Sequence, residues 1–206
     1  MTAEPIRPNA VRQGARSAVR DRLLDAAAEV FAQDGWRHLT MGKVADRAGV
    51  SRQTVYNEFG TKPNLAEDLV FRELESFLDL VRDRIESGRT PVEAIGSAVE
   101  GALSLAEVNP LLRAVLESAH VGDSELLPFI TQSDKLVDRA RNEVGDAIST
   151  RFPDLPLSSD QLLIAADAIV RIVLSHVTHP TRLPAEVGLE LAWLVSAILK
   201  GVDGGN

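Results

Sequence analysis

Four side chains that can each form several hydrogen bonds lie within six residues of the chain, at Arg52, Gln53, Tyr56 and Asn57. On a helix these positions share one side, because residues three and four apart are neighbours on the helix surface. Arginine can bind guanine and glutamine can bind adenine through paired hydrogen bonds, each worth about 1–3 kcal/mol of base discrimination. Tyrosine and asparagine can bind phosphates as well as base edges. These residue types indicate contact with a nucleic acid.

The sequence around these residues predicts two short helices, over about 41–48 and 51–59, joined by a tight turn at Gly49. Ala45, Gly49 and Val55 stand in the Ala-x3-Gly-x5-Val arrangement of a helix-turn-helix. The small Ala45 lets the helices cross closely, and glycine adopts the positive φ that the turn needs. The alternative is that two short capped helices only complete an all-helical core, and that their polar face is simply solvated.

Charge is divided unevenly along the 206 residues, although the net charge is -8. Residues 1–62 hold ten Lys/Arg against seven Asp/Glu, whereas residues 63–206 hold twelve against twenty-three. A polyanion could therefore bind only at the N-terminal end. The arm over residues 1–16 is basic and predicted to be flexible, and it either follows the minor groove of DNA or is only a solvated tail.

Composition excludes several other classes of protein. Cysteine is absent, which excludes disulfides and thiolate metal sites. The sequence has no apolar run of about 18 residues and no signal-peptide pattern, so we expect a cytoplasmic, nucleoid-associated protein that does not bind membranes. No phosphate-binding glycine loop, nucleophile elbow or His-Glu-x-x-His motif occurs, so we expect neither an enzyme nor a cofactor.

Hydrophobic periodicity and capping residues predict an all-α fold. The apolar residues recur with the period of a helix, and no window alternates as a strand would. Capping residues followed by proline or glutamate mark several helix starts. Besides the two short helices, we expect helices over about 17–34, 62–87, 90–107, 109–120, 124–151, 159–179 and 184–200.

Residues 18–66 resemble the DNA-binding domain of the TetR family of bacterial transcriptional regulators. The resemblance rests on the helix-turn-helix followed by Thr54-Val55-Tyr56, Phe59-Gly60 and Lys62-x-x-Leu65. It implies a three-helix helix-turn-helix DNA-binding domain over residues 17–62. It also implies a helical ligand-binding and dimerisation domain over 63–206.

The resemblance also implies which residues contact DNA when a dimer binds a palindromic operator. Some of the matching positions face bases and others hold phosphates. Glu58 departs from the family, which often has histidine there, and its carboxylate would repel phosphate unless it turns towards an arginine or a cytosine. The predicted DNA contacts are Thr40, Ser51, Arg52, Gln53, Thr54, Tyr56, Asn57 and Lys62.

The last two predicted helices are apolar on nearly every side, so each needs cover on both flanks. Pairing with a second copy would cover them, and the resemblance implies dimerisation through these helices. The alternative is that both are central core helices of a monomer. The predicted dimer residues are Leu163, Ala166, Val170, Leu174, Leu191, Trp193, Leu194 and Ile198.

The helices between residues 62 and 151 enclose an effector pocket if the resemblance holds. Since aromatic residues are few there, a lipophilic ligand is expected. The predicted lining residues are Phe77, Leu105, Leu112, Leu116, His120 and Phe129. The alternative for His120 is that it lies on a solvated face of its helix and lines no pocket.

His176 and His179 are three residues apart, a spacing that metal sites use, but no third ligand is evident. We therefore expect these histidines to cap a helix and expect no bound metal.

Together these features predict a ligand-responsive transcriptional regulator, most simply a homodimeric repressor that a small lipophilic effector releases from its operator. The competing hypothesis is a helical ligand-binding or protein-interaction module whose helix-turn-helix does not contact DNA.

Overall fold

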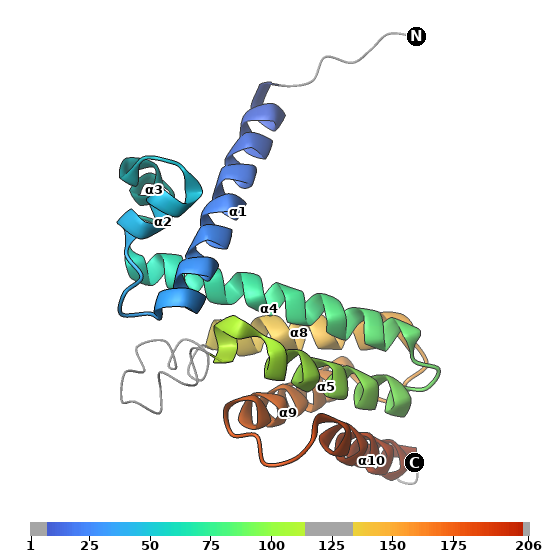
Figure 1. The fold of residues 1–206 in the computed structure, drawn as a ribbon. Helices are drawn as coiled ribbons and strands as arrows, with labels where there is room; N and C mark the ends of the chain where they lie inside the picture. The colour runs from blue at the N-terminus through green and yellow to red at the C-terminus, as the bar shows by residue number, and fades with distance from the viewer. Residues whose placement is uncertain (1–7, 114–133, 204–206) are drawn as a thin grey trace. The chain divides into compact units, whose positions relative to one another are not determined.

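The computed structural model describes residues 8–113 and 134–203, and every regular element in these two ranges is an α-helix (Figure 1). The chain divides into two compact units, Met1–Val70 and Phe71–Asn206. The sequence placed the boundary at residue 62, whereas the structure places it inside a helix. The helix that crosses the boundary is α4 (Lys62–Ser87), and its first turns belong to the N-terminal unit.

The N-terminal unit contains α1 (Pro8–Asp34), α2 (Met41–Ala48), α3 (Arg52–Phe59) and the start of α4. Its core is apolar and closely packed, with almost no exposed surface on Leu23, Phe31, Leu39, Val44, Val55 and Leu65. The prediction that the first helix starts near residue 17 is wrong, because α1 begins at Pro8. Proline suits a first helical turn, where its missing N–H has no partner to lose. The prediction of a flexible arm is therefore wrong for residues 8–16, and residues 1–7 lie outside the described range.

The C-terminal unit contains the rest of α4 with α5 (Pro91–Val108), α8 (Asp134–Arg151), α9 (Ser159–Thr178) and α10 (Pro184–Asp203). The predicted helix starts are confirmed at Thr90 and Ser158, whose side chains cap α5 and α9.

Asn109 caps the next helix start, accepting the Leu112 N–H at 2.8 Å. The predicted end of that helix and the predicted start near residue 124 lie outside the described residues. By length and apolar composition α9 resembles a membrane-spanning helix, but a core helix of a soluble bundle has the same character.

α10 packs against α5 through two glycines. A Cβ atom added at Gly188 would lie 2.7 Å from the carbonyl oxygen of Gly96, and one added at Gly96 would lie 3.1 Å from the carbonyl of Gly188. The two backbones can approach this closely only because neither residue has a side chain. Val187 and Leu191, on either side of Gly188, are consequently buried in the core.

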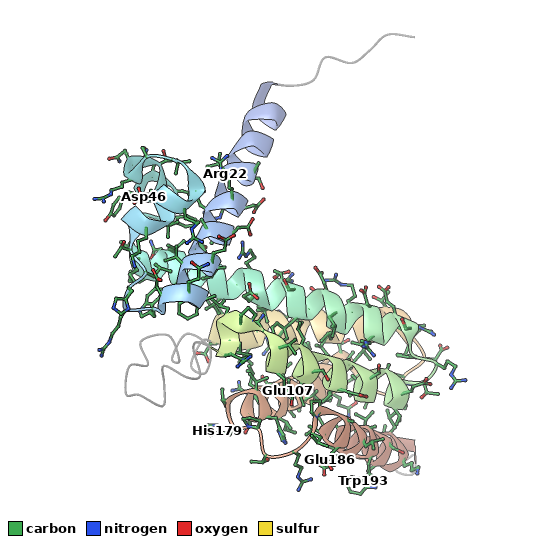
Figure 2. All side chains as sticks on the ribbon, in the orientation of Figure 1. Arg22, Asp46, Glu107, His179, Glu186 and Trp193 are labelled. Carbon is green, nitrogen blue, oxygen red and sulfur yellow. The ribbon has the colours of Figure 1, made fainter. Side chains whose placement is uncertain are left out.

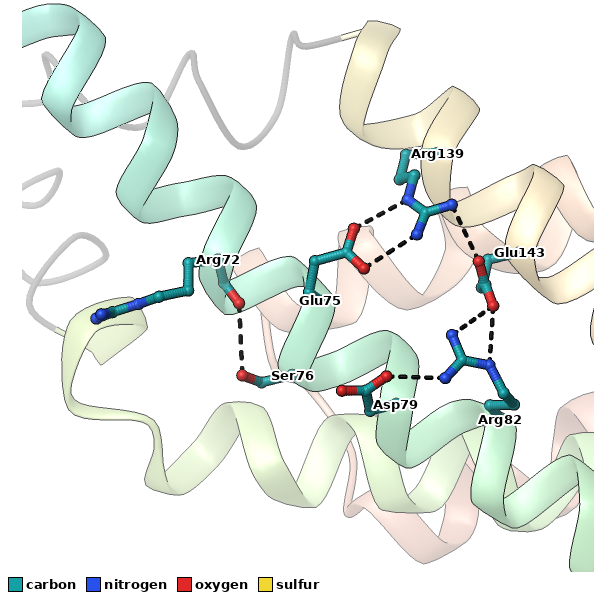
Figure 3. Close-up of polar contacts among 7 residues, drawn as sticks. All are labelled: Arg72, Glu75, Ser76, Asp79, Arg82, Arg139 and Glu143. Atoms are coloured by element: carbon teal, nitrogen blue, oxygen red, sulfur yellow. Dashed lines mark hydrogen bonds and ion pairs between the residues drawn. The ribbon is translucent and has the colours of Figure 1, made fainter. Parts of the chain in front are cut away.

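A chain of alternating charges joins α4 to α8 (Figure 3). Arg139 binds both carboxylate oxygens of Glu75, at 2.9 and 3.0 Å, and reaches Glu143 at 3.0 Å. Glu143 in turn accepts from Arg82, whose other nitrogen donates to Asp79 at 2.8 Å. The hydrogen bonds from Arg139 lower the pKa of Glu75 below its ordinary value of 4.5.

We predict that Gly188→Ala lowers the free energy of unfolding by about 1–3 kcal/mol, because the added methyl group meets backbone rather than a movable side chain. Chemical denaturation of the purified chain measures this. Gly201→Ala is the matched control on the same helix, since nothing lies within 4 Å of its added Cβ. The control should be neutral or stabilising by up to about 1 kcal/mol. Equal stability of the two variants would contradict the close contact.

We also predict that the Glu75 carboxylate contributes acid-sensitive stability. Its pKa is lower in the folded state, so its contribution is present above the unfolded value of about 4.5 and is lost as pH falls through the folded value. The free energy of unfolding, measured from pH 7 down to pH 3, should therefore fall less steeply in Glu75→Gln than in the wild type. Glu107→Gln, an exposed glutamate without an ion pair among the described residues, should keep the wild-type slope. An unchanged slope in Glu75→Gln would refute the prediction.

Candidate nucleic-acid interface

The predicted helix-turn-helix is confirmed in the geometry of α2 and α3. Gly49 ends α2 in the left-handed conformation, with φ 66° and ψ 38°, and the N–H of Val50 returns to the Ala45 carbonyl at 3.0 Å. Val44, Ala45 and Val55 have no exposed surface, so they fill the space beneath the turn. The polar side of α3 is left facing outwards as a result.

Two of the predicted DNA contacts, Thr40 and Ser51, also cap helices, and a third, Thr54, is bonded to the second cap. The Thr40 hydroxyl oxygen accepts the Lys43 N–H at 3.2 Å, and the Ser51 hydroxyl oxygen accepts the Thr54 N–H at 3.1 Å. The Ser51 and Thr54 hydroxyls also lie 2.9 Å apart and share a hydrogen bond. Because these bonds use acceptor lone pairs, the Thr40 hydroxyl hydrogen remains available to a phosphate, as does one hydrogen of the Ser51 and Thr54 pair.

The outward face of α3 carries Arg52, Gln53, Tyr56 and Asn57, all exposed. The Gln53 amide donates to the Asn57 side-chain oxygen at 2.8 Å, which fixes both amides while the Gln53 oxygen and the Asn57 nitrogen stay free to bind outwards. The Arg52 guanidinium lies over Gly42, where an added Cβ would be 2.9 Å from Nε. This group would have to swing away from α2 to reach a base.

Lys62 is placed differently from the other predicted contacts. Its half-buried ammonium group donates to the Trp36 carbonyl at 2.7 Å and lies 4.2 Å from the centre of the Trp36 ring. It thereby ties the loop before α2 to the start of α4. A phosphate contact would require this ammonium group to share its three hydrogens between the carbonyl and the phosphate.

The sequence left the direction of Glu58 open, and in the structure Glu58 turns towards an arginine. Its Oε1 accepts from Arg20 at 3.0 Å, and the same guanidinium binds Asp68 at 2.5 Å. Sequence reasoning missed Arg20 and Asp68, because they lie 38 and 10 residues from Glu58 on two other helices. The only sequence feature that pointed to such a contact was Glu58 itself, a carboxylate on a helix whose other residues are cationic or neutral.

Two further cations hold α2 to α1. Arg47 binds Glu29 and Gln33, both at 2.8 Å, and Lys43 binds Asp34 at 2.6 Å. The hydrogen bond from Lys43 lowers the pKa of Asp34. Much of the positive charge of the N-terminal unit therefore has a partner within the unit, whereas Arg52 stays exposed on α3.

Comparison with known proteins places this geometry in a family. The family model described as "Bacterial regulatory proteins, tetR family" matches residues 23–69, and the one described as "Bacterial Tetracyclin repressor, C-terminal domain" matches residues 91–197. The second match alone spans 107 of the 206 residues. The chain belongs to the TetR family. Proteins of this family are transcriptional regulators and not enzymes.

Relatives of this TetR-family chain are named as transcriptional regulators or repressors. The HTH-type transcriptional regulator AlkX of Mycobacterium tuberculosis is 27% identical over 197 residues, 95% of this chain and 92% of AlkX. The repressor KstR of the same organism is 32% identical over 58% of this chain and 54% of KstR. The crystal structure of the TetR family repressor AlkX from Dietzia sp. strain DQ12-45-1b has a TM-score of 0.74 at 27% identity, covering 88% of this chain and 95% of that one.

The predicted dimer residues of this TetR-family chain fall into three groups. Ala166, Val170 and Leu191 are buried in the core of the single chain, so the prediction that they face a partner is corrected. Trp193 and Ile198 are exposed. The half-buried group is Leu163, Leu174 and Leu194.

Sequence reasoning missed two exposed apolar residues on the same helices, Ile164 on α9 and Leu189 on α10, which are 70% and 74% exposed. On helices apolar all round, periodicity does not tell which side faces the core.

The predicted effector residues are only partly described. Leu112 is buried, Phe77 and Leu105 are half-buried, and Leu116, His120 and Phe129 lie outside the described residues. A small apolar cavity of about 40 Å³ lies elsewhere, among α5, α8, α9 and α10, and none of the predicted effector residues lines it.

Among the described residues no group of three metal-binding side chains occurs. His179 caps α9, and His176 lies 3.0 Å from the carbonyl oxygen of Ile172 in the same helix.

Proposed function

We propose that this protein is a homodimeric transcriptional repressor that binds a palindromic operator through α3 and leaves it when a small lipophilic effector binds the C-terminal unit. The observation that carries the proposal is the exposed polar face of α3 on a correctly closed helix-turn-helix. An N-terminal recognition-helix residue such as Arg52 is the kind that reads base edges in the major groove. The protein would act in the cytoplasm, on the nucleoid.

Specificity and positioning divide between different residues in this proposal. Arg52 and Gln53 are the candidates for base contacts, and Tyr56 and Asn57 for contacts with either bases or phosphates. Thr40, Ser51 and Thr54 would hold phosphates with their remaining hydroxyl hydrogens. Lys62 would join them only while keeping its bond to Trp36.

An apolar surface on α9 and α10 supports the dimer. Ile164, Leu189 and Trp193 are each at least 70% exposed, and Leu189 and Trp193 lie one helical turn apart. Figure 2 shows Trp193 projecting away from the other helices of its unit. Soluble monomers rarely expose large apolar patches, so a second copy would cover this face. Leu163, Leu174 and Leu194 would flank it.

The composition of the C-terminal core supports a lipophilic effector, because the core consists almost entirely of aliphatic side chains. The Dietzia AlkX repressor is described as implicated in biodegradation of n-alkanes, and an aliphatic compound of that class is the effector we propose here. Among the described residues, Phe77, Leu105 and Leu112 would line the pocket. Binding would favour a conformer whose two recognition helices no longer match the groove spacing.

Duplex DNA flanking the protein's own gene is the substrate that tests DNA binding. We expect footprinting to show a two-fold symmetric site, and the affinity to fall steeply with rising salt as condensed counterions are released. Arg52→Ala should weaken operator binding by about 5- to 150-fold and relax the preference at one base position. Addition of n-alkanes or their oxidation products should release the DNA.

The control for this experiment is Arg89→Ala, which removes an equally cationic side chain, 85% exposed, from the C-terminal unit. It should leave affinity and base preference unchanged. Equal effects of both variants, or no retention on any duplex at low salt, would instead favour a helical module that does not contact DNA.

The dimer is tested by sedimentation at micromolar concentration. The wild type should sediment as a dimer, and a Leu189→Ser and Trp193→Ser double variant should shift towards monomer, because it removes apolar area from the proposed face. Val108→Ser is the matched control, since Val108 is 70% exposed but lies on α5. A monomeric wild type would overturn the two-fold operator arrangement.

A further inference from the structure

We propose that Arg20 is a positioning residue for DNA binding, which seats the recognition helix by bridging Glu58 of α3 and Asp68 of α4. The inference rests on the proposed function of α3 and adds a residue that sets its orientation without touching DNA. It also assigns a role to Glu58, the residue at which this chain departs from the family pattern.

A single guanidinium joins three helices at this point. Arg20 Nη1 donates to Glu58 Oε1 at 3.0 Å and Nη2 donates to Asp68 Oδ2 at 2.5 Å. The same group lies 5.1 Å from the centre of the Phe59 ring. The Glu58 side chain is only 12% exposed, so its carboxylate faces into the unit. Bonds that end on two different helices restrain the position of one helix against the other.

The bridge adds a directional restraint on the rotation of α3 about its own axis. α3 buries Val55 and Phe59, which decide the side that faces the core, but apolar packing is less directional than a hydrogen bond. Successive residues are about 100° apart around a helix, which places Glu58 about 200° from Tyr56. Tethering Glu58 therefore adds a restraint on the exact rotation of the outward face. A small rotation would displace side chains that must meet base edges within hydrogen-bond distance.

Without Arg20 the two carboxylates would be left close to each other. Burial raises the pKa of Asp68, and Arg20 offsets part of this effect, while the nearby charge of Glu58 raises it further. Loss of the guanidinium would thus leave two partly buried, mutually repelling carboxylates between α3 and α4. The repulsion would push the end of α3 away from α4 in addition to removing the tether.

The competing role for Arg20 is a direct phosphate contact, and salt dependence separates the two. A cation that binds phosphate adds about 0.9 to the slope of log affinity against log salt, whereas a positioning residue leaves the slope unchanged. The Arg20→Lys variant also distinguishes the two roles. A lysine ammonium group can still bind a phosphate, but it does not reproduce the planar guanidinium that bridges two carboxylates.

The experiment measures operator affinity against salt for Arg20→Met, Arg20→Lys, Glu58→Gln and the Arg20→Met/Glu58→Gln double variant. Each single variant should bind about tenfold more weakly with the wild-type slope, and the double variant should bind no more weakly than the weaker single one. The exposed Arg22→Met, on the same helix and labelled in Figure 2, corrects for the loss of one positive charge.

Two results would overturn the proposal. Tighter binding by Glu58→Gln would mean that Glu58 faces phosphate, and a slope reduced by about 0.9 in Arg20→Met with rescue by lysine would mean a phosphate contact.

A measurement without DNA keeps the inference separate from the proposed function. Amide hydrogen exchange over residues 52–59 should be about tenfold faster in Arg20→Met than in the wild type or Arg22→Met. If the wild type binds no duplex, the proposed function fails and this exchange still decides the bridge. Unchanged exchange would refute the bridge whatever the DNA result.

Discussion

The recognition helix is eight residues long, and an isolated helix of that length is not stable in water. Its structure therefore depends on caps at both ends and on tertiary burial of its inner side. Ser51 caps its first turn, Gly60 closes its last turn with φ 72°, and Val55 and Phe59 bury the inner side. The Arg20 bridge adds polar contacts from α3 to α1 and α4 through Glu58 and Asp68. The exposed face can consist of polar residues because Val55 and Phe59 on the inner side supply the buried apolar contacts.

Charge has separate uses in the two units. In the N-terminal unit, ion pairs bind α2 to α1, and Arg20 binds α3 and α4, while Arg52 stays exposed on α3. In the C-terminal unit, the alternating chain from Glu75 to Arg82 binds α4 to α8. α4 contributes side chains to both networks, so each unit holds a different part of one helix. The acidic balance of residues 63–206 disfavours contact between this part of the chain and phosphates.

The exposed face of α3 was largely predictable, because caps and a turn are local features. Thr40, Gly49 and Ser51 mark helix ends through bonds within a few residues, and burial of Val55 then determines which side of α3 is exposed. Lys62 and Glu58 were harder, since their partners Trp36 and Arg20 lie 26 and 38 residues away. No local pattern indicates whether a charged group meets solvent, a carbonyl or another helix.

The sequence by itself determined the all-helical class, most helix starts, the helix-turn-helix and the basic N-terminal end, because each follows from periodicity, caps or charge counts. Tertiary structure alone decided which faces of α9 and α10 are covered. Both helices are apolar on nearly every side, so Ala166 and Leu191 look no different from Ile164 and Trp193 in sequence. The Gly96 and Gly188 contact seats α10 on α5, which buries Leu191 and leaves Trp193 exposed, since a rigid helix can turn only one side inwards.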